Sequence, residues 1–150
     1  MEYLSEKNSV LFVFDKIDEK IAKEISEFSE LISLFPLPEG KKVSDPSLLE
    51  IEGVKIFFSS GNFLKKYEEE LDLDKIRTIV ELVKKRHLNP KVESDFKEEI
   101  YYLDPIPDII AVASSKTDFM NYKGISIITC SPEEPAQINL RTREISKVSI

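Results

Sequence analysis

The chain has few of the residues on which several kinds of site depend. Its 150 residues include one cysteine, Cys130, and one histidine, His87. A single cysteine cannot form an internal disulfide, which fits a reducing, intracellular location. Beyond the lone His87, neither a Cys/His metal set nor a Ser-His-Asp combination is available. The four glycines, at positions 40, 53, 61 and 124, are too scattered for a loop that cradles phosphate.

Long apolar runs are also missing. No run approaches the roughly 20 residues that span a bilayer, and residues 1–7 lack the basic-then-apolar pattern of a secretion signal. We therefore predict a cytoplasmic protein that does not enter a membrane. The net charge of −7 disfavours a broad electrostatic grip on nucleic acid, because such binding needs clustered Lys and Arg. Glutamine occurs once while Glu and Lys are abundant, a bias typical of thermophilic proteins.

The hydrophobic pattern of the first third predicts a strand and then a helix. We expect one domain over residues 1–150, since no linker divides the chain. The apolar run 10–14 has the length of a buried central strand. After it, apolar residues recur at steps of three and four, which predicts an amphipathic helix over 17–35 that ends before Pro36. This helix is expected to pack on a sheet through Ile21, Ile25, Phe28 and Ile32.

The rest of the chain reads as alternating strands and helices. Gly53 separates two strands at 48–52 and 54–59. A helical block over 62–88 is expected in two pieces, broken near 71–72, with Asp74 as the cap of the second piece. Further strands are predicted near 99–103, 108–113, 124–130, 136–142 and 144–149. We expect one sheet to contain the strands 10–14, 54–58, 109–112 and 125–129.

Four segments, in this order and spacing, carry a family resemblance: 45–58, 81–90, 104–110 and 122–125. Together they resemble the C-terminal half of the small (B) subunit of archaeal family-D and eukaryotic replicative DNA polymerases. The strand–loop–strand over 107–129 resembles the end of a calcineurin-like metallophosphoesterase domain. The resemblance implies an α/β fold with truncated calcineurin-like phosphoesterase-type sheet layers flanked by helices. Because such a fold is truncated, we expect it to expose an apolar edge or face that a partner covers.

The metal motifs of that family are not preserved. Active relatives use carboxylates, an Asn and several His to hold two metals that activate a water molecule. The first two motifs would precede Val10, where nine residues remain. The place of the third motif, Gly-Asn-His-Asp, is held by Asp15, Lys16, Ile17 and Asp18. The fourth, His-Gly, is replaced by Ser60 and Gly61, and the fifth, Gly-His-x-His, by Ala113, Ser114, Ser115 and Lys116. Ile and Lys cannot supply the converging oxygen or imidazole ligands, so we assign no catalytic, cofactor-binding or metal-binding residue and predict a non-enzyme without a cofactor.

The resemblance also implies a function and a partner. It implies a non-catalytic accessory subunit of a replicative DNA polymerase holoenzyme, which binds the catalytic chain and modulates its stability or activity. We expect an archaeal, thermophilic source, a family-B catalytic subunit as partner together with further small subunits, and only weak or indirect contact with DNA. Two alternatives stay open. One is a metal-dependent nuclease or phosphodiesterase with a rearranged site built from Asp15, Asp18, Asp104 or Asp108; the other is a protein-interaction module unrelated to replication.

The remaining polar residues are assigned structural roles. His87 is expected to pack or to cap the end of a helix, where its positive charge suits the helix dipole. Asp104 and Asp108 bracket two prolines, so they cannot share a helical face and are expected to form turns. The basic run 84–86 is predicted to be solvated helix surface, and Cys130 a small core residue.

Tyr101 and Tyr102 are adjacent in a segment predicted as a strand. Neighbouring strand residues point to opposite faces, so one ring should enter the core and the other should face outward. The outward tyrosine could anchor a partner, because exposed tyrosines are enriched at interfaces.

Overall fold

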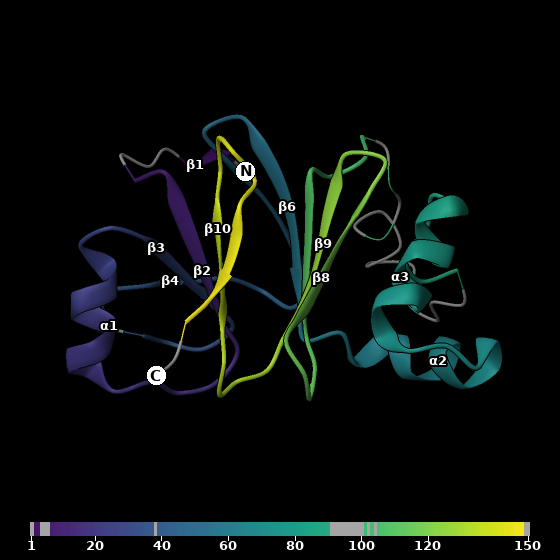
Figure 1. The fold of residues 1–150 in the computed structure, drawn as a ribbon, viewed down its shortest axis with the longest axis horizontal. Coiled ribbons are helices and arrows are strands. Elements are labelled where there is room, and N and C mark those ends of the chain that lie inside the picture. Colours follow the sequence, from purple (N-terminus) through teal and green to yellow (C-terminus); the bar gives the residue numbers. More distant parts are fainter. Residues whose placement is uncertain are drawn as a thin grey trace.

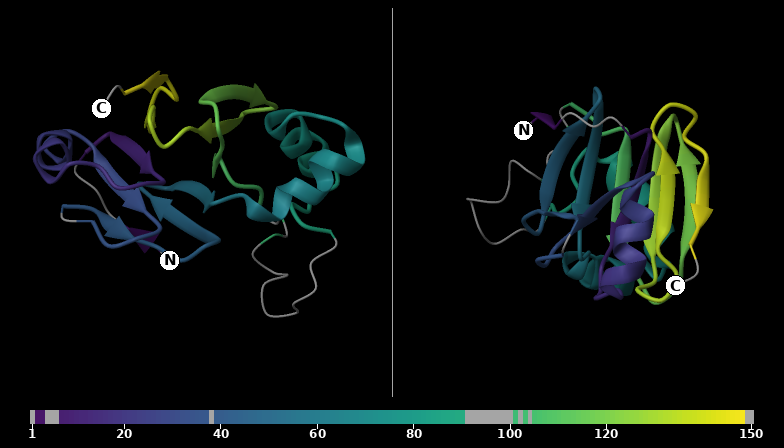
Figure 2. Two further views of the ribbon diagram at one scale, coloured as in Figure 1. Left: turned by 90° about the horizontal axis from the view of Figure 1, so that it is seen from below. Right: turned by 90° about the vertical axis from the view of Figure 1, so that its left-hand side faces the viewer.

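The computed structural model describes residues 2–3, 7–37, 39–90, 101, 103 and 105–148. They form four layers: a helix, a five-stranded sheet, a six-stranded sheet and a pair of helices (Figures 1 and 2). The central strands of each sheet are therefore buried on both faces, one face against helix and one against the other sheet. Strands buried on both faces read as unbroken apolar runs rather than as an alternation.

The six-stranded sheet is mixed. Strands β6, β7 and β9 run parallel, β5 is antiparallel to β6 but parallel to β1, and β8 is antiparallel to β9. In spatial order the sheet consists of β1 (Glu2–Tyr3), β5 (Ser47–Ile51), β6 (Val54–Ser59), β7 (Ile109–Ala113), β9 (Ile125–Cys130) and β8 (Asp118–Tyr122).

The five-stranded sheet faces it. Strands β2, β3 and β4 are parallel, and β10 runs antiparallel to both β2 and β11. In spatial order this sheet consists of β11 (Ile145–Lys147), β10 (Ala136–Asn139), β2 (Ser9–Val13), β3 (Glu30–Ser33) and β4 (Lys41–Lys42).

The carboxyl ends of four strands, β2, β6, β7 and β9, lie at one common edge of the two sheets, here called the carboxyl edge. Strands β6, β7 and β9 are mutually parallel, so they end together. The segment 131–135 links the end of β9 to the start of β10, and β2 runs antiparallel to β10. Strand β2 therefore also ends at the carboxyl edge, and the loops after all four strands meet there.

Three apolar layers hold the elements together. Between the sheets, Phe12 and Phe58 are fully buried, and their rings stack with centroids 5.7 Å apart. On the outer face of the six-stranded sheet lie a 3-10 turn (Asn62–Leu64), α2 (Lys65–Leu71) and α3 (Lys75–Lys84). Ile79 and Leu82 of α3 are buried against that face. The third layer lies between α1 (Glu19–Ser26) and the five-stranded sheet.

The long helix predicted over 17–35 is wrong, because the chain forms α1 and then β3. The side chain of Asp18 accepts hydrogen bonds from the first-turn amides and so fixes the start of α1. Leu31 and Ile32 are both fully buried, one facing α1 and the other facing the second sheet. A strand between two apolar layers needs apolar residues at successive positions, and Ile32 matches the spacing of the predicted helix by coincidence. Phe28, expected on the packed stripe, is 57% exposed.

Other predictions from the sequence are confirmed. The hairpin of β5 and β6 turns at Glu52 and Gly53, whose φ angles of 50° and 79° suit a two-residue type I′ turn. The helical block divides at Asp72, whose φ of 53° ends α2. Asp74 caps α3 through a bond of 2.9 Å from the Arg77 amide to its carboxylate.

Two strand predictions need correction or lie outside the described residues. Three of the four strands expected in one sheet are there, but β2 belongs to the other sheet, because its partners are β3 and β10. Of the strand expected at 99–103, residues 99, 100 and 102 lie outside the described residues, and neither Tyr101 nor Leu103 is in a strand. Strand β8 was not predicted at all.

Candidate functional site

The loop after β2 uses its acidic residues locally. The Asp15 carboxylate accepts a hydrogen bond of 2.8 Å from the Lys16 amide. The Asp18 carboxylate accepts one of 2.8 Å from the Lys20 amide and one of 3.4 Å from the Ile21 amide, and so caps α1. At the place where the family resemblance would put the third metal motif, these two carboxylates thus close a turn and begin a helix.

The loop after β6 is held by a residue that the sequence did not single out. Asp45, which precedes β5, accepts hydrogen bonds of 2.8 Å from the Ser59 hydroxyl and 3.1 Å from the Ser60 amide. The Gly61 amide donates to the Ser59 hydroxyl oxygen at 3.0 Å. We call these four residues the Asp45 clasp. A Cβ at Gly61 would approach the Val112 Cβ to 3.1 Å, and its φ of 75° also favours glycine, so this turn packs closely on β7.

The loop after β7 is fixed to its neighbours by backbone and hydroxyl bonds. The Ser114 amide donates to the Cys130 carbonyl at 2.8 Å, and the Lys75 ammonium donates to the Ala113 carbonyl at 3.0 Å. The Thr129 hydroxyl lies 3.3 Å from the Lys116 carbonyl, which it can serve as donor. At the place where the family resemblance would put the fifth metal motif, these backbone amide and carbonyl groups therefore have hydrogen-bond partners within the chain.

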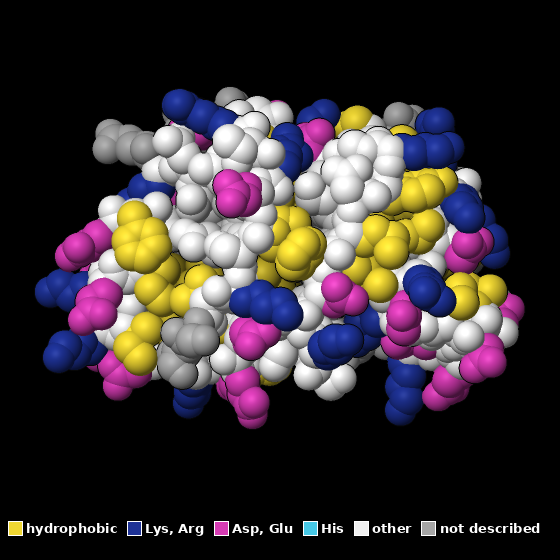
Figure 3. All heavy atoms as spheres, viewed as in Figure 1, with side chains coloured by type: hydrophobic (Ala, Val, Ile, Leu, Met, Phe, Trp, Pro, Cys, Tyr) yellow, Lys and Arg dark blue, Asp and Glu magenta, His cyan; other side chains and the backbone are white. Residues whose placement is uncertain are grey.

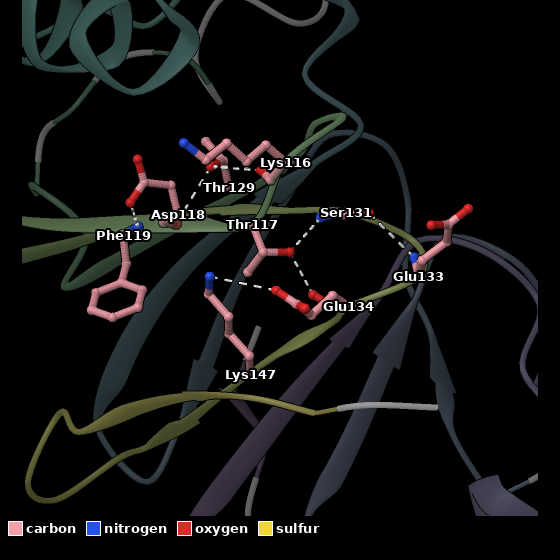
Figure 4. A network of polar contacts seen from close by, with 9 residues as sticks. All are labelled: Lys116, Thr117, Asp118, Phe119, Thr129, Ser131, Glu133, Glu134 and Lys147. Carbon is pink, nitrogen blue, oxygen red and sulfur yellow. Dashed lines mark hydrogen bonds and ion pairs between the residues drawn. The ribbon is translucent and has the colours of Figure 1, made fainter.

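The polar network in Figure 4 extends this loop to the second sheet. The Thr117 hydroxyl donates to the Glu134 carbonyl and accepts from the Ser131 amide at 2.8 Å. The Glu134 carboxylate pairs with the Lys147 ammonium of β11 at 3.4 Å, with both side chains about half exposed. An exposed pair of this kind contributes little stability. The network links the β8–β9 hairpin to the β10–β11 hairpin.

Among the described residues, no group of three or more His, Cys, Asp or Glu side chains could hold a metal ion. Three of the four carboxylates considered for a rearranged site are among the described residues, and these three do not come together. Asp15 and Asp18 follow β2 at the carboxyl edge, whereas Asp108 precedes β7 at the opposite edge. There the Asp108 carboxylate accepts a hydrogen bond of 2.9 Å from the Lys55 amide and so ties the start of β7 to β6. Asp104 lies outside the described residues.

A pocket of about 430 Å³ opens at the edge opposite the carboxyl edge. Its lining includes three cations, Lys84, Arg86 and Lys123, and one carboxylate, Asp108. We call it the basic pocket; its other lining residues are Val83, Ile106, Pro107, Tyr122, Gly124 and Ile125. The Lys84 ammonium lies 2.8 Å from the Glu81 carboxylate, and this hydrogen bond raises the pKa of Lys84.

His87, Tyr101 and Cys130 are buried. His87 is 9% exposed, and its Nδ1 accepts a bond of 3.0 Å from the Asn89 amide. The ring of Tyr101 packs against Phe63 with centroids 4.8 Å apart, and burial raises the pKa of its hydroxyl. Burial also raises the pKa of the Cys130 thiol to about 12. Tyr102, the other member of the tyrosine pair, lies outside the described residues.

The exposed apolar surface includes β8, the outermost strand of the six-stranded sheet. Phe119 is 45% exposed and Met120 is 38% exposed. In Figure 3, apolar side chains gather on the face between the β10–β11 hairpin and α3. A signal in the sequence could have located β8: Lys123 and Gly124 form a two-residue turn with φ angles of 49° and 85°, and apolar residues stand on both sides of it.

The layers and the carboxyl-edge loops are those of a calcineurin-like phosphoesterase fold, as the sequence predicted. Two solved structures share it over almost the whole chain. Protein TM1076 of Thermotoga maritima has 12% identity and a TM-score of 0.51, with 95% of this chain and 98% of that chain covered. Vps29 of Chaetomium thermophilum has 12% identity and a TM-score of 0.53, with 95% and 97% covered. No family model and no curated protein sequence matches the chain.

These comparisons correct the predicted function and partner. Vps29, whose name stands for vacuolar protein sorting 29, shares the fold over 95% of this chain. This is more of the chain than the four segments that resemble the polymerase subunit. The polymerase accessory role, the family-B catalytic partner, the further small subunits and the replication assignment are therefore wrong. The four motif matches were short, and three of them mark turns or helix ends that many α/β folds contain.

Among the described residues, no helix is long and apolar enough to cross a membrane.

Proposed function

We propose that this chain is a protein-interaction module, unrelated to replication, built on a calcineurin-like phosphoesterase fold and performing no phosphoester chemistry itself. The observation that carries the proposal is the exposed apolar strand β8, whose Phe119 and Met120 are 45% and 38% exposed. Apolar side chains on an outermost strand are costly in water unless a partner covers them. A module of this kind acts by binding.

The carboxyl edge supports the non-catalytic part of the proposal. Asp15, Asp18 and Asp45 are the carboxylates at the loops where the fold family holds its metals. Each already accepts hydrogen bonds from nearby amides or a hydroxyl. A carboxylate committed to a turn, a helix cap or a clasp is not directed at a shared metal ion, which needs several ligands converging on one point.

Two measurements test the proposal. Purified protein is incubated with manganese and a chromogenic phosphodiester, beside variants Asp15→Ala and Asp18→Ala. We expect no hydrolysis above the rate without protein. Turnover that needs manganese and is lost in either variant would contradict the non-catalytic assignment.

The second measurement concerns binding. The tagged protein and a Phe119→Ser, Met120→Ser double variant are used to capture partners from extracts of the native cells. A Phe28→Ser variant serves as the matched control, because Phe28 is 57% exposed on the far side of the molecule, at the end of α1. We expect a partner that is retained by the wild type and by the control but lost by the double variant. Identical capture by all three proteins would refute a role for β8.

A further inference from the structure

Strand β8 differs from the other outer strands of the two sheets. Among the described residues, the outer strands β1 and β4 have two residues each and β11 has three, whereas β8 has five. Natural proteins blunt such edges with short strands, with lysine or with proline. Strand β4 consists of two lysines and β11 contains Lys147, but β8 contains neither lysine nor proline. Its outer row of backbone donors and acceptors has no strand partner in the described part of the chain.

The side chains of β8 extend both apolar layers to this edge. Phe119 lies opposite Ile128, which belongs to the core between the sheets. Met120 lies opposite Ile127, which belongs to the core under α3. Cross-strand neighbours share a face of the sheet, so Phe119 and Met120 are the outer ends of these two layers. Figure 4 shows Phe119 directed away from the polar network rather than into it. A strand added beside β8 would cover both side chains.

A lysine stands near each end of β8, and the strand begins with the acidic Asp118, two residues after Lys116. Lys123 follows the strand and lines the basic pocket together with Arg86. Lys84 has Glu81 as its partner, whereas neither Arg86 nor Lys123 has a carboxylate partner among the described residues. The Lys123 ammonium lies 5.5 Å from the ring centroid of Tyr122. Lys84, Arg86 and Lys123 gather at the basic pocket of a molecule whose net charge is −7, whereas Lys116 lies at the other end of β8. The pocket therefore favours an acidic group at the Lys123 end of the strand.

We propose that β8 is the docking edge for an extended, acidic peptide segment of a partner protein, which adds a strand to the six-stranded sheet and places a carboxylate in the basic pocket. This inference rests on the proposed function and names the chemistry of its ligand. Backbone hydrogen bonds along β8 give the affinity, and side-chain contacts give the specificity. A strand of about five to seven residues spans β8, at roughly 3.3 Å per residue.

A second copy of this chain fits the edge less well. Antiparallel pairing of two β8 strands about Met120 places Lys123 of one copy opposite Thr117 of the other. No carboxylate of the second strand would then lie directly across from Lys123. Each copy also carries a net charge of −7, so two copies repel each other. An acidic peptide supplies the carboxylate that a second β8 strand lacks.

The test uses a fluorescein-labelled probe peptide, Glu-Val-Thr-Val-Thr-Val-Glu, and fluorescence anisotropy with the full chain. A peptide with Lys at both ends tests the charge requirement, and one with proline in place of the central Val tests the backbone requirement, because proline cannot donate to a strand. We expect the acidic probe to bind and both control peptides to bind at least about tenfold more weakly.

Matched protein variants locate the site. We expect Arg86→Gln and Lys123→Glu each to weaken the acidic probe by about fivefold. Lys85→Glu should have less than about a twofold effect, because Lys85 is exposed beside Arg86 but does not line the pocket. A Phe119→Lys, Met120→Lys double variant should abolish binding, whereas Phe28→Lys should leave it unchanged. Circular dichroism of each variant verifies that it is folded.

Several outcomes would overturn the inference: no binding of the acidic probe up to about 1 mM, equal binding of the proline peptide, or unchanged binding by the β8 variants. Sedimentation showing a dimer that Phe119→Lys dissociates would assign the edge to a second copy instead. The proposed function fails on different evidence, namely manganese-dependent hydrolysis or partner capture that does not depend on β8. Loss of probe binding with β8-dependent capture intact would refute only the acidic-peptide inference.

Discussion

Asp45 and Ser59 are joined by a hydrogen bond of 2.8 Å from the Ser59 hydroxyl to the Asp45 carboxylate. Asp45 lies in the link between the two sheets, after β4 and before β5, and Ser59 ends β6. The same carboxylate oxygen accepts the Ser60 amide at 3.1 Å. The link between the sheets therefore fixes the loop that follows β6.

Removing the Asp45 carboxylate should destabilise this loop. We expect Asp45→Ala to lower the free energy of unfolding by about 1–3 kcal/mol, because a hydroxyl and an amide lose a charged acceptor. Asp45→Asn keeps an acceptor oxygen and should cost less. Urea denaturation measures both, with Asp15→Ala as the control, since Asp15 accepts only from the adjacent amide. Equal stability of Asp45→Ala and wild type would show that the clasp is energetically unimportant.

The caps of α1 and α3 provide a test of the helix boundaries. Asp18→Ala and Asp74→Ala should each cost about 1 kcal/mol, because each removes the acceptor for first-turn amides. If the helix began at residue 17, as the hydrophobic spacing predicts, Asp18 would lie inside it. The substitution of Asp18 by alanine would then be neutral or stabilising. Urea denaturation of the two variants separates these cases.

Cys130 should behave as a protected thiol. Its pKa is raised to about 12 by burial, so the folded protein holds a neutral, inaccessible thiol at pH 8. We expect iodoacetamide to label Cys130 only when urea unfolds the protein. Rapid labelling of the native protein, measured by mass spectrometry, would contradict the burial of this side chain.

The same shift makes stability depend on pH in the alkaline range. The unfolded thiol ionises near its ordinary pKa of 9.0, while the folded thiol stays protonated until about pH 12. Between these values the unfolded state binds fewer protons, so the stability falls as the pH rises, by up to about 1.4 kcal/mol per pH unit. Urea denaturation at pH 8 and pH 10.5 should show a smaller decrease for Cys130→Ala than for wild type. The buried Tyr101, whose pKa is also raised, contributes a decrease of the same sign in both proteins.

Substitutions on β8 should separate binding from folding. Phe119 is 45% exposed and Met120 is 38% exposed, so we expect Phe119→Ser and Met120→Ser each to cost only about 1 kcal/mol. Phe58→Ala, in the core between the sheets, should cost about 3–5 kcal/mol. Thermal and urea denaturation give both values. A large loss of stability on either β8 substitution would mean that these residues serve the fold rather than a partner.

The sequence predicted the fold class because buried strands and helix stops have clear local signals. The hairpin at Gly53, the break at Asp72 and the cap at Asp74 each depend on a few neighbouring residues. Leu31 and Ile32 were misassigned because their role depends on two separate layers that meet only in the folded chain. Strand β8 was missed because a half-exposed edge strand has no continuous apolar run.

The candidate site was harder to predict for the same reason. Asp45 and Ser59 are 14 residues apart in the sequence and belong to different structural units, so no local pattern joins them. The basic pocket combines the end of α3 with two loops that precede strands. Short motif matches pointed to a polymerase subunit, because turns and helix ends resemble one another across unrelated proteins with similar strand order.

The Asp45 clasp also bears on how this edge of the molecule could be engineered. A histidine placed at position 60 would enter a loop already fastened to Asp45, and the neighbouring loops at 15–18 and 114–117 are fastened by other hydrogen bonds. A metal ion needs several ligands that converge on one point, and the described residues contain no group of three that could hold one. A single substitution would therefore loosen one loop without gaining a metal ion in compensation. A metal site could be designed at this edge only by rebuilding several loops together, whereas an exposed strand such as β8 can be altered one residue at a time.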